Sequence, residues 1–239
     1  MTYCLGILLE SGFVVAGDSR TTAGVDQIST FKKLVLFEVP GERVMALLSA
    51  GNLATTQSVV SLIRQRWGDP NAQGNLAVSL TMFDAALAVG DVLREVITRD
   101  GPYVDASASL LLAGQIAGES PRLFLIYPAG NFIEATLETP FLQIGETKYG
   151  KPVLDRVVSP LMDLDTAAKL ALVSMDSTVR SNLSVAPPIH LLCYRRDSFA
   201  SDVQITVEAN DPYMTEISQA YGAGIVRLVA DLPNPGWVR

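Results

Sequence analysis

The sequence predicts an α+β fold in which two mainly antiparallel sheets pack face to face, with a layer of helices outside each sheet. Predicted strands and helices follow one another in blocks: strands, two helices, strands, two helices, strands and a final helix. Blocks of this kind favour antiparallel sheets, because parallel sheets need strict strand–helix alternation. Hydrophobic residues make up 49% of the 239 residues, and no linker or change of composition divides them. We therefore expect a single domain over residues 1–239.

The N-terminal block contains four predicted strands: Tyr3–Leu9, Phe13–Asp18, Leu34–Phe37 and Val44–Ser49. Glu10-Ser11-Gly12 joins the first two in a pattern typical of a β-hairpin. Antiparallel neighbours pair first residue with last, so this hairpin brings Asp18 back towards Thr2.

Two helices are predicted next, at Asn52–Trp67 and Thr81–Arg99. Each carries apolar residues at helical spacing. The stripe of the second helix consists of Phe83, Leu87, Gly90, Leu93 and Ile97. We expect these two faces to cover a sheet.

The remaining strands are predicted at Ser109–Ile116, Arg122–Tyr127, Phe132–Thr136, Pro188–Tyr194 and Val203–Val207. One helix is expected after Gly145 and another over Asp165–Arg180. Asp211-Pro212 has the residues that begin a helix, an aspartate cap and a proline in the first turn. The domain therefore ends in a helical extension from about residue 211, whose apolar face can pack on its own subunit or on a neighbour.

Several function classes are disfavoured by composition. No run of twenty apolar residues predicts a membrane span, and a net charge of -7 without a basic cluster argues against nucleic-acid binding. Cys4 and Cys193 lie in apolar runs and are expected to be reduced core residues of a cytoplasmic protein. The only histidine, His190, lies in an apolar run, so neither a metal site nor a Ser-His-Asp triad is expected. No motif calls for a cofactor.

Thr2 is the first candidate for chemistry. Removal of Met1 would leave Thr2 with a free α-amine beside its own hydroxyl. An α-amine titrates at about 7.7–8.0, the range that suits a general base at neutral pH. A threonine hydroxyl becomes a nucleophile when such a base takes its proton. On the dipeptide alone, an ordinary Met-Thr start is the better interpretation, and the residues downstream reverse it.

Three further residues fit a site around Thr2. Asp18 ends the strand that returns to Thr2, and Lys33, which precedes an apolar strand, can pair with it. A lysine in this cluster would lower the pKa of the threonine hydroxyl. Gly51 joins a strand to a helix N-terminus, where a backbone N–H can stabilise an oxyanion. Taken singly, each has an ordinary structural explanation: a turn aspartate, a solvated lysine and a strand–helix turn.

Together these residues resemble the proteasome β-subunit family of N-terminal nucleophile hydrolases. The matching segments are Thr2 heading a strand, Ala-Gly-Asp-Ser-Arg at 16–20, Lys32-Lys33-Leu34, Ser49-Ala50-Gly51, Ala54-Thr55-Thr56-Gln57, Ile144-Gly145 and Arg180–Ser184. The segment 24–33 is similar to the bacterial proteasome-like branch called Anbu. The resemblance covers most of the chain and rests on the order and spacing of these segments, since none is highly specific alone.

This resemblance implies a four-layer αββα sandwich and assigns roles. Thr2 would be the nucleophile, its amine the base, Asp18 and Lys33 the supporting ion pair, and the Gly51 N–H the oxyanion donor. The accessory positions depart from the family: Glu146 stands where a serine is usual, and Ser181 replaces an aspartate, while Ser184 matches. The pocket for the residue before the scissile bond would be lined by Thr21, Phe31, Val35, Ser49 and Leu53. We expect it to accept small to medium apolar side chains.

Two functions remain open. The first is a threonine peptidase that cleaves amide bonds of peptides or unfolded protein inside a homo-oligomeric ring or open spiral. The second is a scaffold or binding assembly with a weak or dormant site. The trio Thr2, Asp18 and Lys33 favours the first, and Glu146 with the altered 181–188 segment favours the second. The sequence does not identify an ATPase partner.

Overall fold

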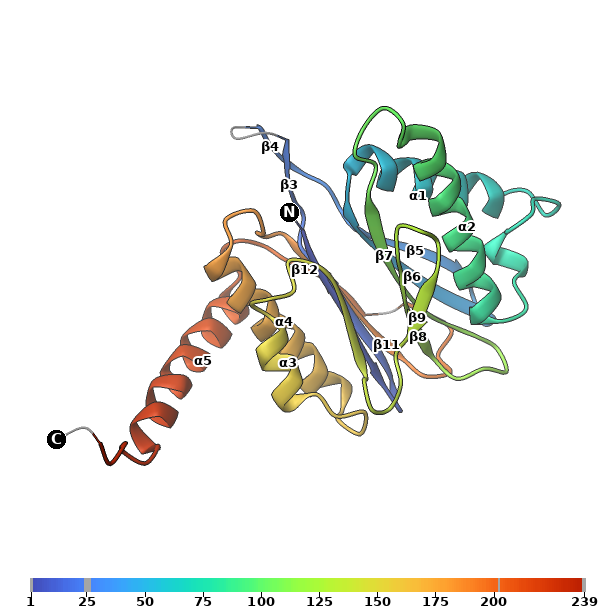
Figure 1. Ribbon diagram of the computed structural model, residues 1–239. Coiled ribbons are helices and arrows are strands. Elements are labelled where there is room, and N and C mark those ends of the chain that lie inside the picture. The colour runs from blue at the N-terminus through green and yellow to red at the C-terminus, as the bar shows by residue number, and fades with distance from the viewer. Residues whose placement is uncertain (1, 24–26, 202, 238–239) are drawn as a thin grey trace.

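The computed structural model describes residues 2–23, 27–201 and 203–237, and it has the predicted sandwich architecture. Two five-stranded antiparallel sheets pack face to face, and helices cover the outer face of each (Figure 1). The first sheet has the strand order β10-β1-β2-β11-β12. Its strands are β1 (Tyr3–Leu9), β2 (Gly12–Gly17), β10 (Phe141–Gly145), β11 (Ile189–Arg195) and β12 (Val203–Val207).

The second sheet has the order β5-β6-β7-β8-β9. Its strands are β5 (Leu34–Val39), β6 (Arg43–Gly51), β7 (Ala108–Ile116), β8 (Arg122–Ile126) and β9 (Phe132–Glu134). A separate two-stranded ribbon, β3 (Arg20–Ala23) and β4 (Gln27–Thr30), extends from the edge of the sandwich near Thr2 (Figure 1).

All the described helices except α3 (Lys151–Val157) begin at a capping side chain. They are α1 (Leu53–Trp67), α2 (Met82–Asp100), α3 (Lys151–Val157), α4 (Leu164–Ser181) and α5 (Pro212–Asp231), with a 3-10 turn η1 (Leu76–Val78). Asn52 caps α1, and Thr81 with Asp84 forms a capping box on α2. Such caps satisfy backbone N–H groups that have no partner within the helix.

Three apolar clusters hold the layers together. One lies between the two sheets, where Phe13 stacks on Tyr194 with ring centroids 4.7 Å apart. A second joins β5–β9 to α1 and α2, and a third joins the other sheet to α3 and α4. Strands such as β1 and β2 are therefore buried on both faces. This explains why they are almost continuously apolar instead of alternating.

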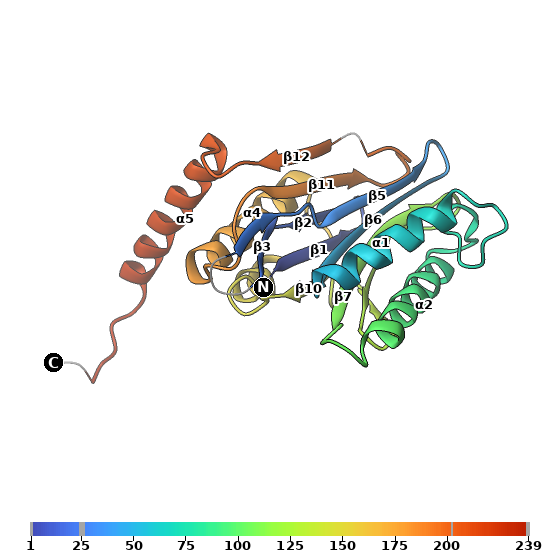
Figure 2. The same ribbon diagram turned by 90° about the horizontal axis from the view of Figure 1, so that it is seen from above.

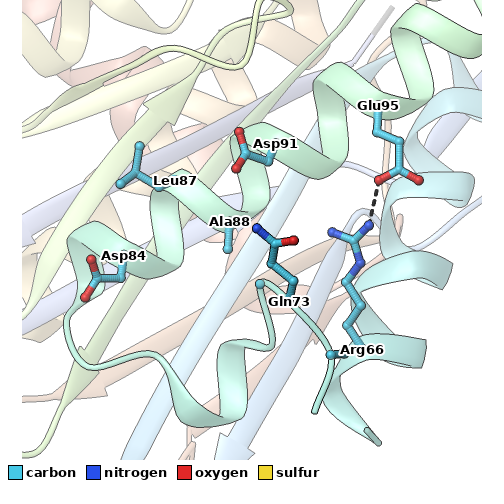
Figure 3. A pocket seen from close by; sticks show the side chains of 9 residues that line it. Arg66, Gln73, Asp84, Leu87, Ala88, Asp91 and Glu95 are labelled. Carbon is cyan, nitrogen blue, oxygen red and sulfur yellow. Dashed lines mark hydrogen bonds and ion pairs between the residues drawn. The ribbon is translucent and has the colours of Figure 1, made fainter. Parts of the chain in front are cut away.

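The predicted stripe on α2 is partly wrong. Phe83 and Leu87 are each 44% exposed, whereas the helix packs on the sheet through smaller residues such as Ala86 and Val89. A Cβ at Gly90 would lie 2.2 Å from the carbonyl oxygen of Gly130, so small residues let the helix approach closely. Leu87 instead lines an open groove of about 510 Å³, beside the 2.6 Å ion pair between Arg66 and Glu95 (Figure 3).

Three strands were absent from the sequence prediction. β3 and β4 flank residues 24–26, which lie outside the described part, and β10 is an edge strand beside β1. The side chains of β10 are only partly buried except at Ile144, so its apolar signal is weak. It matters for the site, because it pairs with β1 from Tyr3 opposite Gly145 onwards.

The C-terminal helix α5 projects away from the sandwich (Figures 1 and 2). It begins at Pro212, one residue after the cap Asp211. Not one of its residues is fully buried, although Met214 and Ile217 pack partly against the cluster under α4. In the described part of the chain, no helix is long and apolar enough to span a membrane.

Candidate active site

Thr2 lies at the start of β1, at the end of the sandwich where several elements meet. The residue is 9% exposed, and its carbonyl oxygen accepts a hydrogen bond from the Glu146 N–H at 2.7 Å. Gly145 permits this contact: its φ is +83°, and a Cβ there would lie 1.9 Å from the Thr2 oxygen. The turn after β10 therefore fixes the backbone of Thr2 from one side.

Asp18 fixes the same backbone from the other side. The hairpin register pairs Cys4 with Gly17, so Asp18 follows directly opposite Tyr3. Its Oδ1 accepts the Tyr3 N–H at 3.1 Å, while Oδ2 accepts the N–H groups of Arg20 at 3.2 Å and Ala186 at 3.3 Å. The side chain is completely buried. A carboxylate in such a position needs these donors, because burial without them is costly.

Lys33 completes this network. Its Nζ lies 2.6 Å from Asp18 Oδ1 and 2.6 Å from the Arg20 carbonyl oxygen, and the residue is 5% exposed. Burial raises the pKa of the Asp18 carboxyl above its usual range, and the Lys33 ammonium counters that shift. Lys33 thus places a buried ammonium group, paired with Asp18, near the start of β1.

A small cavity of about 90 Å³ contains both Thr2 and Lys33 in its lining. Gly51, at the end of β6, also lines it and precedes the N-terminus of α1. Its φ is +117°, and a Cβ there would meet the Ser107 carbonyl oxygen at 2.4 Å, so only glycine fits. The positive end of the α1 dipole lies next to this wall of the cavity.

Four of the five predicted pocket residues line the same cavity: Thr21, Phe31, Ser49 and Leu53. Val35 does not. It packs against the cluster beneath α1 and α2, whereas its neighbour Leu34 faces the space between the sheets. Strand alternation thus turns Val35 away from the cavity. Thr56, which the sequence analysis did not select, lines the cavity from the first turns of α1.

The predicted accessory residues are less closely gathered. Glu146 is 7% exposed, and its Oε2 accepts a hydrogen bond from Asn182 Nδ2 at 2.9 Å. Ser181, the last residue of α4, is exposed, and the Ser184 N–H donates to Asn182 Oδ1. Asn182, the C-cap of α4, was missed by sequence reasoning, because an amide at a helix end carries no catalytic signal of its own.

His190 has a structural environment. It lies in β11, and its Nδ1 is 3.2 Å from Thr206 Oγ1 on the paired strand β12. Within residues 2–23, 27–201 and 203–237, no group of three or more His, Cys, Asp or Glu side chains is placed to hold a metal ion.

The arrangement has the parts for nucleophilic attack by a hydroxyl. A threonine, a buried ammonium and a glycine at a helix N-terminus all border one cavity. The buried cation favours loss of a proton from a nearby hydroxyl, and the helix N-terminus favours negative charge on an oxygen in the cavity.

Comparison with known proteins agrees with this geometry. Residues 2–187 match the family model described as proteasome subunit. No curated protein matches the chain. A solved structure of Anbu (ancestral beta-subunit) from Yersinia bercovieri is 52% identical, with a TM-score of 0.95 over 100% of both chains.

Two further solved structures support the same grouping. Anbu from Hyphomicrobium sp. strain MC1 is 48% identical, with a TM-score of 0.92 over 98% of this chain and 99% of that one. The helical assembly of the Anbu complex from Pseudomonas aeruginosa is 46% identical, with a TM-score of 0.91 over 99% of both chains. The fold is thus that of the N-terminal nucleophile hydrolases, and the chain belongs to the proteasome subunit family, in its Anbu branch.

Proposed function

We propose that this protein is a threonine peptidase that hydrolyses amide bonds with Thr2, once removal of Met1 has exposed the Thr2 α-amine. The observation that carries the proposal is the shared cavity: Thr2, Lys33 and Gly51 border it, and Lys33 is held by the buried Asp18. A structural ion pair alone does not require a threonine beside it, or a glycine at a position where no larger residue fits.

In the proposed reaction, the α-amine of Thr2 accepts the hydroxyl proton, through a water molecule, as Oγ1 attacks the substrate carbonyl carbon. The Lys33 charge stabilises the developing alkoxide, and the Gly51 N–H binds the oxyanion. Collapse of the tetrahedral intermediate transfers the proton to the leaving amine and leaves an ester on Oγ1. Water then hydrolyses the ester by the same proton path and restores Thr2.

The cavity bears on the substrate. At about 90 Å³ it equals the liquid volume of about three water molecules, well below the several hundred Å³ of a typical ligand pocket. Phe31 and Leu53 make it partly apolar, and none of the described residues that line it carries a carboxylate. These properties favour a small, uncharged side chain before the scissile bond.

We further propose that the protein works as a homo-oligomer, a ring or open spiral that encloses the site, in the cytoplasm. The Pseudomonas aeruginosa relative is a helical assembly, which supports a multi-subunit state. The projecting helix α5 supports it too, because Ile225, Val226, Leu228 and Val229 are between 42% and 70% exposed. The substrates would be peptides or unfolded protein, not nucleic acid or membrane.

The alternative is a scaffold whose site is dormant, and the observation that favours it is Glu146. This buried acidic residue bonds to Thr2 through its backbone N–H, at a position where the family usually has a serine. Both functions predict the same fold and assembly, so activity alone separates them.

The test begins with the intact mass of native protein, which shows whether Met1 is removed. An electrophilic peptide probe should then label Thr2 in the wild type and leave Thr2→Ala unlabelled, with unchanged folding and assembly. The two thiols should not compete, because burial raises the pKa of Cys4 far above its usual range and that of Cys193 to about 11. Complete retention of Met1, or equal labelling of Thr2→Ala, would refute the peptidase.

A further inference from the structure

A second buried acid lies next to Thr2, on the side opposite Asp18. Glu146 is 7% exposed, and its N–H is bonded to the Thr2 carbonyl oxygen at 2.7 Å. The α-nitrogen of Thr2 belongs to the same residue as that oxygen. The side chain of Glu146 therefore extends from a backbone that already contacts the residue carrying the amine.

One short segment ties the two acids together. Asn182 Nδ2 donates to Glu146 Oε2 at 2.9 Å, and four residues later the Ala186 N–H donates to Asp18 Oδ2. Asp18 in turn accepts the Tyr3 N–H. The backbone of Thr2 and Tyr3 is therefore held from both sides by buried acidic residues, by Asp18 through its carboxylate and by Glu146 through its backbone N–H.

The two carboxylates differ in their cations. Asp18 has Lys33 at 2.6 Å, and that lysine is 5% exposed. The cation nearest to Glu146 is Lys148, at 3.8 Å, and its side chain is 78% exposed. An exposed lysine at this distance contributes little, whereas a buried carboxylate needs a close positive charge. Glu146 therefore lacks the close buried cation that Asp18 has, and one more buried positive charge would be needed to balance its carboxylate.

We propose that Glu146 is the counter-ion of the Thr2 α-ammonium, a positioning residue that holds the new N-terminus and sets the pH at which it becomes a base. This inference rests on the proposed exposure of Thr2. An opposite charge close to an amine stabilises its protonated form and raises its pKa. Since only the neutral amine can accept the hydroxyl proton, the pair keeps the site largely idle at neutral pH and releases it as the pH rises.

Other charged groups act on the same amine from neighbouring elements. Lys33, before β5, and Lys148, after β10, oppose the shift, whereas Asp18, after β2, supports it. Arg20 in β3 bonds the Leu183 carbonyl oxygen, and Arg180 in α4 is engaged by Asp176. Because Lys33 is paired with Asp18 and Lys148 is exposed, Glu146 is the buried acid next to Thr2 that lacks a buried cation.

The test titrates the amine directly. The full chain is prepared with Thr2 as its first residue, and the rate of acetylation of the α-amine is followed against pH by peptide mass spectrometry. Glu146→Gln should lower the pKa of the amine by about one unit or more, which makes the neutral fraction at pH 7 about tenfold larger. The glutamine oxygen can still accept the bond from Asn182. Glu138→Gln, an exposed position, is the matched control and should leave the pKa unchanged.

Glu146→Ser is the second variant, which keeps the proposal testable if Glu146→Gln does not fold. It removes the same carboxylate and places at this position the residue that is usual in the family, so it should also lower the pKa of the amine. An equal pKa in wild type and in whichever Glu146 variant folds overturns the assignment, as does an equal shift in Glu138→Gln.

Hydrolysis is measured alongside, so that the two ideas can fail separately. In an active protein, Glu146→Gln should move the acid limb of kcat/KM to lower pH. A shifted amine pKa without hydrolysis in either protein supports the counter-ion and refutes the peptidase. Hydrolysis with an unshifted pKa refutes the counter-ion and leaves the peptidase standing.

Discussion

The site around Thr2 and the helix α5 depart in opposite ways from the usual distribution of residues. Folded proteins usually keep charged side chains on the surface and apolar side chains inside. At one end of the sandwich Asp18, Lys33 and Glu146 are almost completely buried. The helix α5, by contrast, exposes a row of apolar side chains and buries none of its residues completely. Buried charges and exposed apolar surface both cost stability within a single chain. We propose that each is retained because another molecule completes the region, a substrate in one case and a neighbouring subunit in the other.

The largest expected effect is at the buried charges. Lys33→Met should reduce hydrolysis by about 10²–10³ and destabilise the fold by about 3–5 kcal/mol, because Asp18 is left buried without its cation. Lys32→Met, one residue earlier but exposed, is the matched control and should change neither. Peptide hydrolysis and urea unfolding measure the two effects. Full activity of Lys33→Met would show that hydrolysis does not need the buried ion pair.

The next largest effect is expected for Gly51→Ala. Its positive φ and the contact with the Ser107 oxygen both oppose a Cβ, so a loss of at least about 3 kcal/mol in the free energy of unfolding is expected. Gly41 also has a positive φ, +76°, but a Cβ added there has no atom within 4 Å, so Gly41→Ala is the comparison variant. It should cost only about 1 kcal/mol. Thermal melts of the two variants separate strain from crowding, and equal losses would mean that the Ser107 contact contributes nothing.

Substrate size should have a smaller effect, about tenfold. The cavity of about 90 Å³ should favour alanine or valine before the scissile bond over phenylalanine by that factor in kcat/KM. Phe31→Ala should enlarge the cavity and narrow the difference. A matched set of fluorogenic peptides measures this. Strong preference for an acidic or basic residue would contradict the assignment of the pocket.

The smallest effect on folding is expected on α5. Val226→Glu and Leu228→Glu replace side chains that are 70% and 61% exposed, so the free energy of unfolding of the subunit should change by no more than about 0.5 kcal/mol. Assembly, measured by light scattering at low micromolar concentration, should weaken. A wild-type protein that is monomeric there, or variants that assemble normally, would show that the apolar row has no role between subunits.

Much of the site could be predicted because its residues lie at or next to the ends of strands, where local turns decide their positions. The hairpin of β1 and β2 returns Asp18 to Tyr3 by register alone, and Gly51 follows a strand and precedes a capped helix. Val35 shows where this reasoning stops. Its position in the family pattern placed it in the pocket, but the pleat of β5 turns it towards the cluster under α1 and α2.

The sequence by itself determined the block order of strands and helices, the two packed sheets and the return of Asp18 to the start of β1, because these follow from apolar patterning and local turns. Only the tertiary structure decided that β10 pairs with β1 and brings Glu146 onto Thr2. It also showed that Asn182 holds Glu146 and that α5 projects from the sandwich. Those contacts join segments more than thirty residues apart, and the register and packing that fix them have no local signal in the chain.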